Sequence, residues 1–360
     1  MNLMETLERL NIDIERVANS RLEGVDFDNL KFGHVKSDHM FIAQYRNGQW
    51  TNISIKPYDY LQLSPACIGM HYGQMIFEGL KAFRLEDGRI GIFRPEANMR
   101  RLQRSAERLA MEPVPADIFM EGLQALLEVD KSWVPHGEEQ SLYIRPFQFG
   151  DEPNIGVKAS ETYSFIIFTC PVGKYYDKPV NVFVEDTYIR AARGGVGEAK
   201  AAGNYAPTLL PARKIKEKGY DQILWSQRVD DTLYAGEIGT MNFFVQIGDK
   251  LITPELDGTI LPGVTRDSII QLAKDEGIEV EERMISVKEI FKAAETGQLK
   301  DAFGAGTAAV ITYIAGLGYH DRHYDLPPIS ERKLSTFFKQ KLNNIRLGKE
   351  ADVHNWMTYV

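Results

Sequence analysis

The sequence predicts a mixed α/β protein of the α+β type, divided into two domains. Its 360 residues are enough for two domains at roughly 150 residues each. Hairpin signals alternate with helical periodicity in both halves, which favours sheets flanked by helices in each. A polar stretch separates two apolar strands near the middle of the chain. We therefore expect a smaller N-terminal domain over 1–170, a linker over 171–180 and a larger C-terminal domain over 181–360.

Three segments carry β-hairpin signals. Each has an apolar run on both sides of a residue pair that tolerates positive φ, which a tight turn requires. The turn pairs are Asn47-Gly48 within 40–50, Asp87-Gly88 within 80–93 and Gly248-Asp249 within 241–253.

Four further segments have the apolar spacing of helices, and three are typical of buried strands. Ser286 and Glu289 form a capping box that opens one helix, and Gly297 ends it. The expected helices are 95–111, 264–277, 286–297 and 330–346. The expected strands are 164–169, 180–184 and 310–314.

The composition excludes several functional classes. A net charge of −8 disfavours a dedicated nucleic-acid or anionic-membrane binder, whose footprint is basic. No apolar run approaches the roughly 20 residues that a membrane-spanning helix needs. Two distant cysteines, Cys67 and Cys170, and an acidic N-terminus without a targeting pattern indicate a cytoplasmic protein.

Lys200 is the only lysine in a run of small residues from Gly194 to Tyr205. Such a run lets the backbone approach a ligand closely and gives the lysine few polar neighbours. Desolvation lowers the pKa of a lysine, and the neutral amine is a nucleophile able to form a Schiff base. The same composition also fits a flexible surface loop with a solvated lysine.

Two other features allow both a chemical and a structural interpretation. Glu237 stands near two glycines, where it could neutralise a cationic ring nitrogen or serve as a turn residue. Tyr143 and Arg145 point to one face of an expected strand. A phenol beside a guanidinium suits a carboxylate-binding corner, but an edge strand with a surface ion pair has the same pattern.

The run 304–309 fits the dinucleotide fingerprint G-x-G-x-x-A. A helix should follow such a turn, whereas 310–314 is β-branched and predicts a strand, so we reject a Rossmann site. Zincin, thioredoxin and P-loop motifs are absent from the sequence, and we expect no metal.

Taken in chain order, these features resemble the branched-chain-amino-acid aminotransferases, which are fold-type IV pyridoxal-phosphate enzymes. The chain looks closest to their longer, eukaryote-like subgroup. The resemblance implies a two-domain fold similar to D-amino-acid aminotransferase, with the cofactor at the domain interface. The matching stretches are 32–33, 38–40, 71–72, 77–83, 93–95, 98–99, 128–131, 142–146, 203–205, 237–242, 261–264, 306–308 and 354–357.

The resemblance also implies roles around pyridoxal 5′-phosphate. Lys200 matches the lysine that binds the cofactor as a Schiff base and then moves the proton of the substrate Cα. Glu237 matches the carboxylate on the pyridine nitrogen, and Tyr205 the phenol on the ring oxygen. Arg101 matches the arginine that pairs with the phosphate, and Arg190 another arginine of the cofactor neighbourhood. The remaining cofactor contacts implied are Thr240, Leu261, Gly263, Val264, Thr265 and Thr307.

For the substrates, the resemblance implies reversible ping-pong transamination of L-leucine, L-isoleucine and L-valine with 2-oxoglutarate, giving branched-chain 2-oxo acids and L-glutamate. Backbone N–H groups of Thr240 and Ala308 match those that take the α-carboxylate. Arg145 matches the residue expected to accept the distal carboxylate of glutamate. Ile155 and Val157 match a loop that reaches the partner's site, so a homodimer is implied. The apolar pocket walls implied are Phe32, Tyr72, Phe77 and Tyr143.

One departure and two alternatives remain. The subgroup often carries a C-x-x-C pair where this chain has Ala309 and Thr312, which excludes a thiol switch there. A D-amino-acid aminotransferase or aminodeoxychorismate lyase would share Lys200 and Glu237 but differ in its carboxylate-binding residues. A non-catalytic scaffold would require a loss of chemistry that the sequence does not contain.

Overall fold

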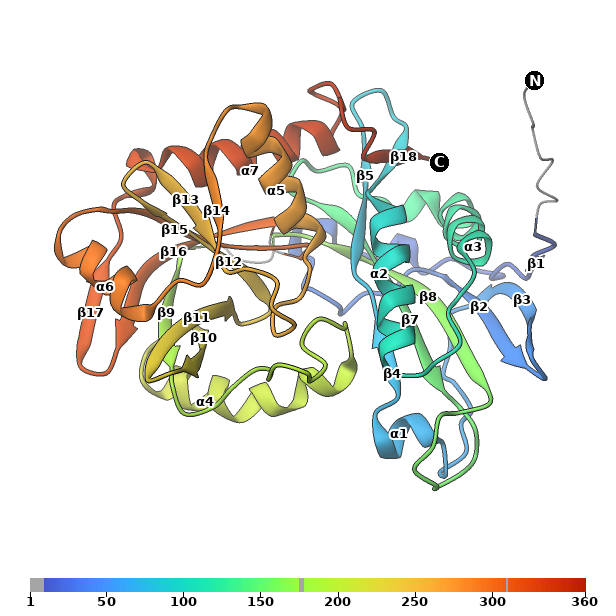
Figure 1. The fold of residues 1–360 in the computed structure, drawn as a ribbon. Coiled ribbons are helices and arrows are strands. Elements are labelled where there is room, and N and C mark those ends of the chain that lie inside the picture. Colours follow the sequence, from blue (N-terminus) through green and yellow to red (C-terminus); the bar gives the residue numbers. More distant parts are fainter. Residues whose placement is uncertain (1–9, 175–177, 309) are drawn as a thin grey trace, which may run out of the picture. The chain divides into compact units, whose positions relative to one another are not determined.

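The computed structural model describes residues 10–174, 178–308 and 310–360 (Figure 1). The chain divides into two compact units, and each is described by itself. The first unit contains the chain up to Gly173 together with His354–Val360, and the second is Lys174–Val353.

The unit boundary falls inside the predicted linker 171–180, of which 175–177 lie outside the described residues. The linker is shorter than predicted, because Pro171 and Val172 still pair with the neighbouring strand and Val180 already begins the next one. The C-terminal residues also differ from the prediction. They belong to the first unit because strand β18 (Met357–Tyr359) pairs with β6 (Ile90–Phe93).

The first unit is built on a nine-stranded sheet in the order β1-β3-β2-β8-β7-β5-β6-β18, with β4 paired to β7. Its remaining strands are β1 (Asp13–Ile14), β2 (His39–Arg46), β3 (Gln49–Pro57), β4 (Met75–Phe77), β5 (Leu80–Arg84), β7 (Ser141–Gly150) and β8 (Tyr163–Val172). Its helices are η1 (Leu22–Gly24), η2 (Phe27–Asn29), α1 (Ile68–Tyr72), α2 (Pro95–Arg108), α3 (Ala116–Val129) and η3 (Lys131–Trp133).

Helices α2 and α3 cover one face of this sheet (Figure 1). Alternate residues of the strands face them, among them Phe41 and Phe165, whose rings lie 6.1 Å apart. The opposite face carries a smaller apolar cluster that includes Ile42, Phe149 and Ile166. The strands therefore read as nearly continuous apolar runs, because both faces of the sheet are partly covered.

The second unit also has a nine-stranded sheet, in the order β11-β10-β9-β16-β15-β12-β13-β14, with β17 on β16. Its strands are β9 (Val180–Glu185), β10 (Gln222–Val229), β11 (Thr232–Ile238), β12 (Met241–Ile247), β13 (Lys250–Thr253), β14 (Val280–Glu282), β15 (Leu299–Gly306), β16 (Val310–Tyr319) and β17 (Arg322–Asp325). Its helices are η4 (Ala202–Asn204), η5 (Ala206–Thr208), α4 (Leu209–Glu217), α5 (Val264–Asp275), α6 (Val287–Glu295), η6 (Ile329–Glu331) and α7 (Lys333–Arg346).

An additional pairing of β11 with β12 closes six of these strands into a ring. One side of the sheet packs on α6 through Ile290 and Phe291. On α7, Phe338 packs on Phe303, which in turn stacks on Phe244 with ring centroids 5.1 Å apart. The ring matters for function because it fixes where β11, β12, β15 and β16 end.

The structure confirms the three predicted hairpins, the four predicted helices and the three predicted strands, with ends shifted by a few residues. Strand β15 ends at Gly306 and β16 begins at Val310, so the described part of the run 304–309 precedes a strand, as expected, and not a helix. Among the described residues, no helix is long and apolar enough to cross a membrane.

Candidate active site

Lys200 follows β9 after a segment without regular secondary structure. Its Nζ lies 3.2 Å from the phenol oxygen of Tyr205. The side-chain amide of Asn204 donates to the carbonyls of Val196 at 2.9 Å and Ala199 at 3.0 Å. The segment is therefore folded back on itself rather than a free surface loop, and the lysine is half-buried.

Glu237 is not a turn residue, because it lies inside β11 and is only 3% exposed. Its Oε1 accepts a hydrogen bond from Nδ2 of Asn242 at 2.9 Å, and its Oε2 lies 2.5 Å from Nε of Arg190. Nη1 of Arg190 donates to the carbonyl of Thr259 at 2.8 Å. A buried carboxylate with these partners is held in one orientation.

Helix α5 begins at Val264 without a side-chain capping hydrogen bond at Gly263. A Cβ at Gly263 would lie 1.9 Å from Oδ1 of Asn242, so any side chain there would displace the Asn242 amide. Nδ2 of Asn242 also donates to the carbonyl of Leu261 at 2.9 Å. Thr265 is buried in the first turn. The N–H groups of such a turn suit an anion.

Three predicted substrate and cofactor contacts lie at neighbouring strand ends. Thr240 lies between β11 and β12, and Thr307 and Ala308 lie between β15 and β16. Strands β12 and β15 pair antiparallel, with Asn242 opposite Ala305. The turns that carry these residues therefore lie at the same end of the two strands.

In the first unit, Arg101 on α2 forms a two-pronged ion pair with Glu78. Nε and Nη2 each lie 2.7 Å from one carboxylate oxygen. Arg101 is 4% exposed and Glu78 0%. Because the pair is buried and bidentate, it fixes the guanidinium plane in one orientation. Sequence reasoning did not assign a role to Glu78, although it lies in the matched stretch 77–83.

Three of the four aromatic residues predicted as pocket walls lie at or next to Arg145, whereas the fourth, Tyr72, bonds to the loop at Ile155. Its Nη2 donates to the Tyr143 phenol at 2.9 Å, and its guanidinium lies 4.6 Å from the ring centroid of Phe77. The Phe32 and Tyr143 rings meet edge to face, with centroids 4.9 Å apart. Gly79 makes room for this arrangement, because a Cβ there would lie 2.2 Å from the Tyr143 oxygen.

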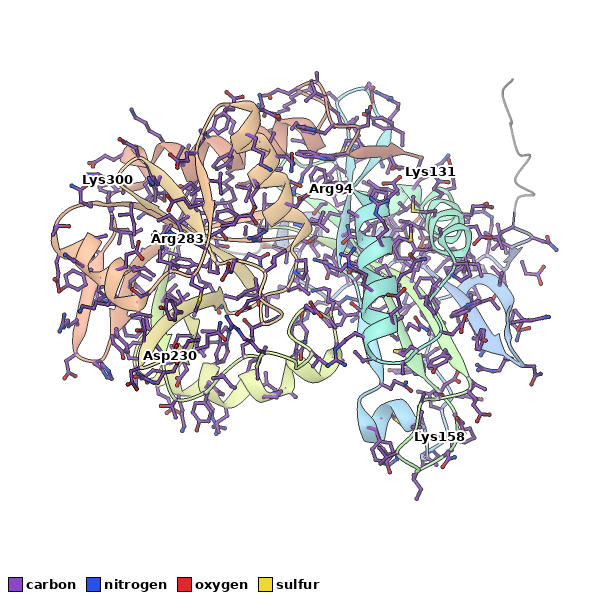
Figure 2. The ribbon with its side chains drawn as sticks, viewed as in Figure 1. Arg94, Lys131, Lys158, Asp230, Arg283 and Lys300 are labelled. Atoms are coloured by element: carbon purple, nitrogen blue, oxygen red, sulfur yellow. The ribbon has the colours of Figure 1, made fainter. Side chains whose placement is uncertain are left out.

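The loop predicted to reach a partner subunit is exposed in this chain. Ile155 is 66% exposed and Val157 86% exposed. The Tyr72 phenol donates to the Ile155 carbonyl at 2.6 Å. Lys158, labelled in Figure 2, pairs with Glu152 at 2.8 Å and so ties down the base of the loop.

Neither cysteine is among the residues of this arrangement that the structure describes. Burial raises the pKa of the Cys170 thiol to about 11, so it is not a thiolate at neutral pH. No group of three His, Cys, Asp or Glu side chains within residues 10–174, 178–308 and 310–360 could hold a metal ion. Ala309 lies outside the described residues, and Thr312 is buried on β16.

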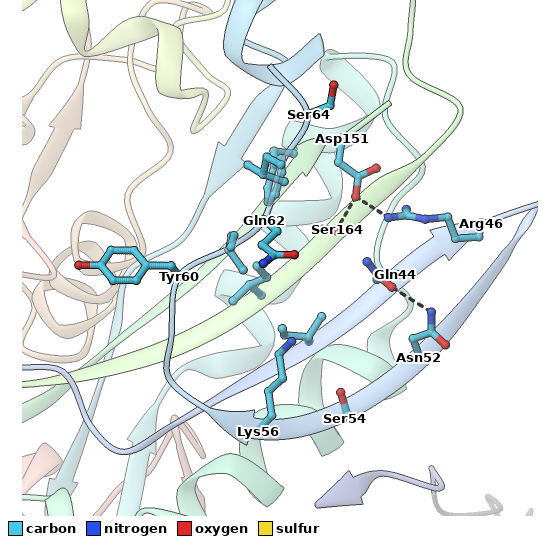
Figure 3. A pocket seen from close by; sticks show the side chains of 15 residues that line it. Gln44, Arg46, Asn52, Ser54, Lys56, Tyr60, Gln62, Ser64, Asp151 and Ser164 are labelled. Carbon is cyan, nitrogen blue, oxygen red and sulfur yellow. Dashed lines mark hydrogen bonds and ion pairs between the residues drawn. The ribbon is translucent and has the colours of Figure 1, made fainter. Parts of the chain in front are cut away.

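A separate polar pocket of about 520 Å³ lies on the first sheet (Figure 3). It is lined from β2, β3 and β8, and the Arg46–Asp151 ion pair crosses it at 2.6 Å. It contains none of the predicted site residues.

The role of Asn242 and the pairing of Arg190 with Glu237 were missed at the level of sequence. Asn242 lies in the matched stretch 237–242, but nothing in its spacing indicates that its amide bridges Glu237 and Leu261. The Arg190–Glu237 contact joins residues far apart in the chain, and only the sheet topology brings them together.

Comparison with known proteins places these features in context. The profile of the family described as "Amino-transferase class IV" matches residues 75–315. The chain is 44% identical over 343 residues to Branched-chain-amino-acid transaminase 1 of Bacillus subtilis, covering 94% of this chain and 96% of that protein. It is 44% identical over 338 residues to the branched-chain-amino-acid aminotransferase of Mycolicibacterium smegmatis, covering 91% and 92%.

Among solved structures, the branched-chain aminotransferase of Thermoproteus uzoniensis, crystallised with norvaline, superposes with a TM-score of 0.71. The two chains are 25% identical, and the match covers 89% of this chain and 99% of that one. The Escherichia coli branched-chain amino acid aminotransferase also has a TM-score of 0.71, at 24% identity, and shares the fold.

Proposed function

We propose, from the premise that this chain belongs to the class IV aminotransferases and is a branched-chain-amino-acid transaminase, that it uses pyridoxal 5′-phosphate and 2-oxoglutarate. The predicted fold class, a mixed α/β fold-type IV enzyme, is confirmed. The reaction proposed is a reversible ping-pong transfer of the amino group of L-leucine, L-isoleucine or L-valine to give L-glutamate. A cytoplasmic location stays a prediction.

The second unit supports pyridoxal phosphate by the chemistry of its side chains. Lys200 supplies an amine, and the phenol of Tyr205 lies 3.2 Å from it. Glu237 supplies a buried carboxylate for a cationic ring nitrogen. The start of α5, where a Cβ at Gly263 would collide with Asn242, supplies N–H donors for a phosphate. The amine suits the aldehyde of the cofactor, the carboxylate suits its pyridinium nitrogen, and the N–H groups suit its phosphate.

When bound, the cofactor supplies an electron-accepting ring that stabilises negative charge at the substrate Cα. Nζ of Lys200 acts as the general base that takes the proton from Cα, with Tyr205 orienting the amine. General acid–base catalysis of this kind contributes roughly 10²- to 10⁴-fold. Arg190 contacts one oxygen of Glu237 and Asn242 the other, so the carboxylate is already oriented and needs no reorganisation during turnover.

In the second unit we assign phosphate binding to Thr265 and Thr307, with backbone donors from Val264; for Arg101 of the first unit, a phosphate contact stays a prediction. Arg101 is prepared for this by its bidentate pair with Glu78, which leaves the guanidinium fixed before any ligand arrives. Backbone N–H groups of Thr240 and Ala308, at one end of β12 and β15, take the substrate α-carboxylate in this proposal.

Arg145 accounts for the two kinds of substrate side chain. The guanidinium of Arg145 lies over the rings of Phe77 and Tyr143. The apolar side chain of a substrate therefore meets mostly aromatic surface. The distal carboxylate of glutamate or 2-oxoglutarate can pair with the same guanidinium. Phe32 closes the wall against Tyr143.

We further propose a homodimer in which the loop bearing Ile155 and Val157 lines the partner's substrate pocket. Two apolar side chains that are 66% and 86% exposed suit a covered surface better than water. Tyr72 fixes the loop by its hydrogen bond to the Ile155 carbonyl.

The observation that carries the proposal is the Lys200–Tyr205 pair in the same unit as the buried Glu237–Arg190 pair. The test is glutamate formation from 2-oxoglutarate with a panel of L- and D-amino acids. We expect L-leucine, L-isoleucine and L-valine to be the best donors, and Lys200→Ala to lose at least about 10²-fold in kcat. Lys288→Ala, an exposed lysine on α6, is the matched control and should retain full activity. Faster turnover of D-alanine, or an active Lys200→Ala variant, would overturn the proposal.

A further inference from the structure

The segment that carries Lys200 is held by side chains rather than by a helix or strand. Between the end of β9 at Glu185 and η4 at Ala202 the chain forms no helix and no extended strand. Gly197 in this segment contacts the backbone of the loop that precedes α5. A Cβ at Gly197 would lie 2.8 Å from the carbonyl oxygen of Gly258 and 2.7 Å from that of Thr259. The two segments are therefore in direct backbone contact.

Thr259 is fixed from both sides at this contact. Its carbonyl accepts from Nη1 of Arg190 at 2.8 Å, and Arg190 also reaches the Gly197 carbonyl at 3.5 Å. Its N–H and hydroxyl donate to Oδ1 of Asp257 at 3.0 and 2.6 Å. Thr259 is 6% exposed, so these bonds are shielded from water.

Asp257 joins three segments of the second unit. Beyond its bonds to Thr259, its Oδ2 accepts from Nε2 of Gln227 on β10 at 2.8 Å and lies 3.3 Å from Nε of Arg193. Its side chain is 9% exposed, whereas that of Arg193 is 54% exposed. Burial alone would raise the pKa of Asp257, but the bonds from Thr259, Gln227 and Arg193 outweigh it and hold the pKa below the usual range.

We propose that Asp257 is a positioning residue for the cofactor site, acting through Thr259 and Arg190 on Glu237 and through Arg193 on the segment that carries Lys200. The contacts form one chain in the order Glu237, Arg190, Thr259, Asp257, Arg193. The loop between Asp257 and Gly263 leads directly into the first turn of α5. One carboxylate thus sets the spacing of the amine, the ring-nitrogen partner and the helix start. This inference rests on the proposed use of pyridoxal phosphate.

The contacts of Asp257 and Thr259 predict that three variants weaken cofactor binding to different degrees. Asp257→Ala removes the acceptors of four hydrogen bonds, and we expect the cofactor Kd to rise about ten-fold or more, as when bonds to a charged group are lost. Thr259→Val keeps the shape and the N–H but loses the hydroxyl, and a rise of about three-fold to ten-fold follows from one lost bond. Thr259→Ser restores the hydroxyl and should lie within about two-fold of wild type.

The experiment measures the Kd of pyridoxal phosphate for each apoenzyme by fluorescence titration, together with kcat, the KM for L-leucine and the melting temperature. A positioning role predicts a raised Kd and a lowered kcat, with the KM for L-leucine nearly unchanged. Asp249→Ala, in the exposed turn between β12 and β13, is the control and should match wild type in all four.

The outcomes separate this inference from the proposed function. If wild-type protein binds no pyridoxal phosphate, the proposed function fails. If wild type binds but Asp257→Ala and Thr259→Val bind equally well, or lose melting temperature with no change in Kd, Asp257 is only structural and this inference is overturned. Should Asp257→Ala not fold, the Thr259→Val and Thr259→Ser pair decides the question alone.

Discussion

Gly263→Ala adds a single methyl group at the start of α5, and the contacts of that methyl group allow the change in the free energy of unfolding to be worked out. Gly263 has φ −70°, so alanine adopts its backbone conformation without strain. The added Cβ would lie 1.9 Å from Oδ1 of Asn242 and 3.3 Å from Cβ of Arg266. Since helix backbone cannot retreat cheaply, the Asn242 amide must move.

The magnitude follows from the bonds that Asn242 makes. Its Nδ2 donates to Oε1 of Glu237 and to the carbonyl of Leu261, both at 2.9 Å. A bond to a charged group contributes about 1.5–3 kcal/mol and a neutral one about 0.5–1.5 kcal/mol. Replacing glycine by alanine also stabilises the folded state by about 0.4–1 kcal/mol, because alanine lowers the conformational entropy of the unfolded chain. The net destabilisation is about 2 kcal/mol.

The assay is thermal and urea unfolding of the apoenzyme, followed by a cofactor titration. For a unit of the size of Lys174–Val353, about 2 kcal/mol lowers the melting temperature by roughly 4–8 °C. Glu237 loses a partner as well, so cofactor affinity should fall with stability. The control is Gly24→Ala, where a Cβ meets nothing within 4 Å.

A double-mutant cycle with Asn242→Ala makes the reasoning refutable. Once the Asn242 side chain is gone, adding Gly263→Ala should cost less than about 0.5 kcal/mol. If Gly263→Ala costs the same with and without Asn242, or costs nothing, the collision is not the cause and the argument is wrong.

Three further predictions follow from the first unit. Arg145→Gln should raise the KM for 2-oxoglutarate about ten-fold or more while the KM for L-leucine changes little, and equal changes in both would refute the carboxylate role. At Asp38, burial alone would raise the carboxyl pKa, but hydrogen bonds from Arg21, Ser20 and Trp133 hold it below 3.8. The stability that wild type gains over Asp38→Asn should therefore be constant above about pH 5 and shrink as the pH falls through the folded pKa, which urea unfolding from pH 7 to 3 measures. The double variant Ile155→Asp with Val157→Asp should sediment as a monomer, and an unchanged assembly would contradict the interface.

Many elements of the fold depend on short segments of the chain and can therefore be predicted from the sequence. The hairpin turns at Asn47, Asp87 and Gly248 follow from backbone chemistry, and the structure contains all three. Helix α6 begins where its capping box predicts, with the Ser286 hydroxyl accepting from the Glu289 N–H at 3.0 Å. Helix α3 was not predicted, although Pro115 and the apolar spacing from Ile118 to Leu127 carry the signal.

What the sequence did not provide depends on pairings between distant residues. Strand β18 completes the first sheet only because the chain returns to it after the whole second unit, and three residues carry no such signal. The bidentate ion pair of Arg101 with Glu78 and the hydrogen bonds from Asn242 to Glu237 and Leu261 likewise cannot be predicted without the tertiary structure. The candidate site residues were identified by resemblance, whereas their partners come from the geometry alone.

The most direct test of the central claim is the visible absorption spectrum of purified protein supplied with pyridoxal phosphate. We predict a band that bleaches when L-leucine is added, returns with 2-oxoglutarate, and never forms in this way in Lys200→Ala. A band that ignores L-leucine but responds to D-alanine, or no band at all, would contradict the account.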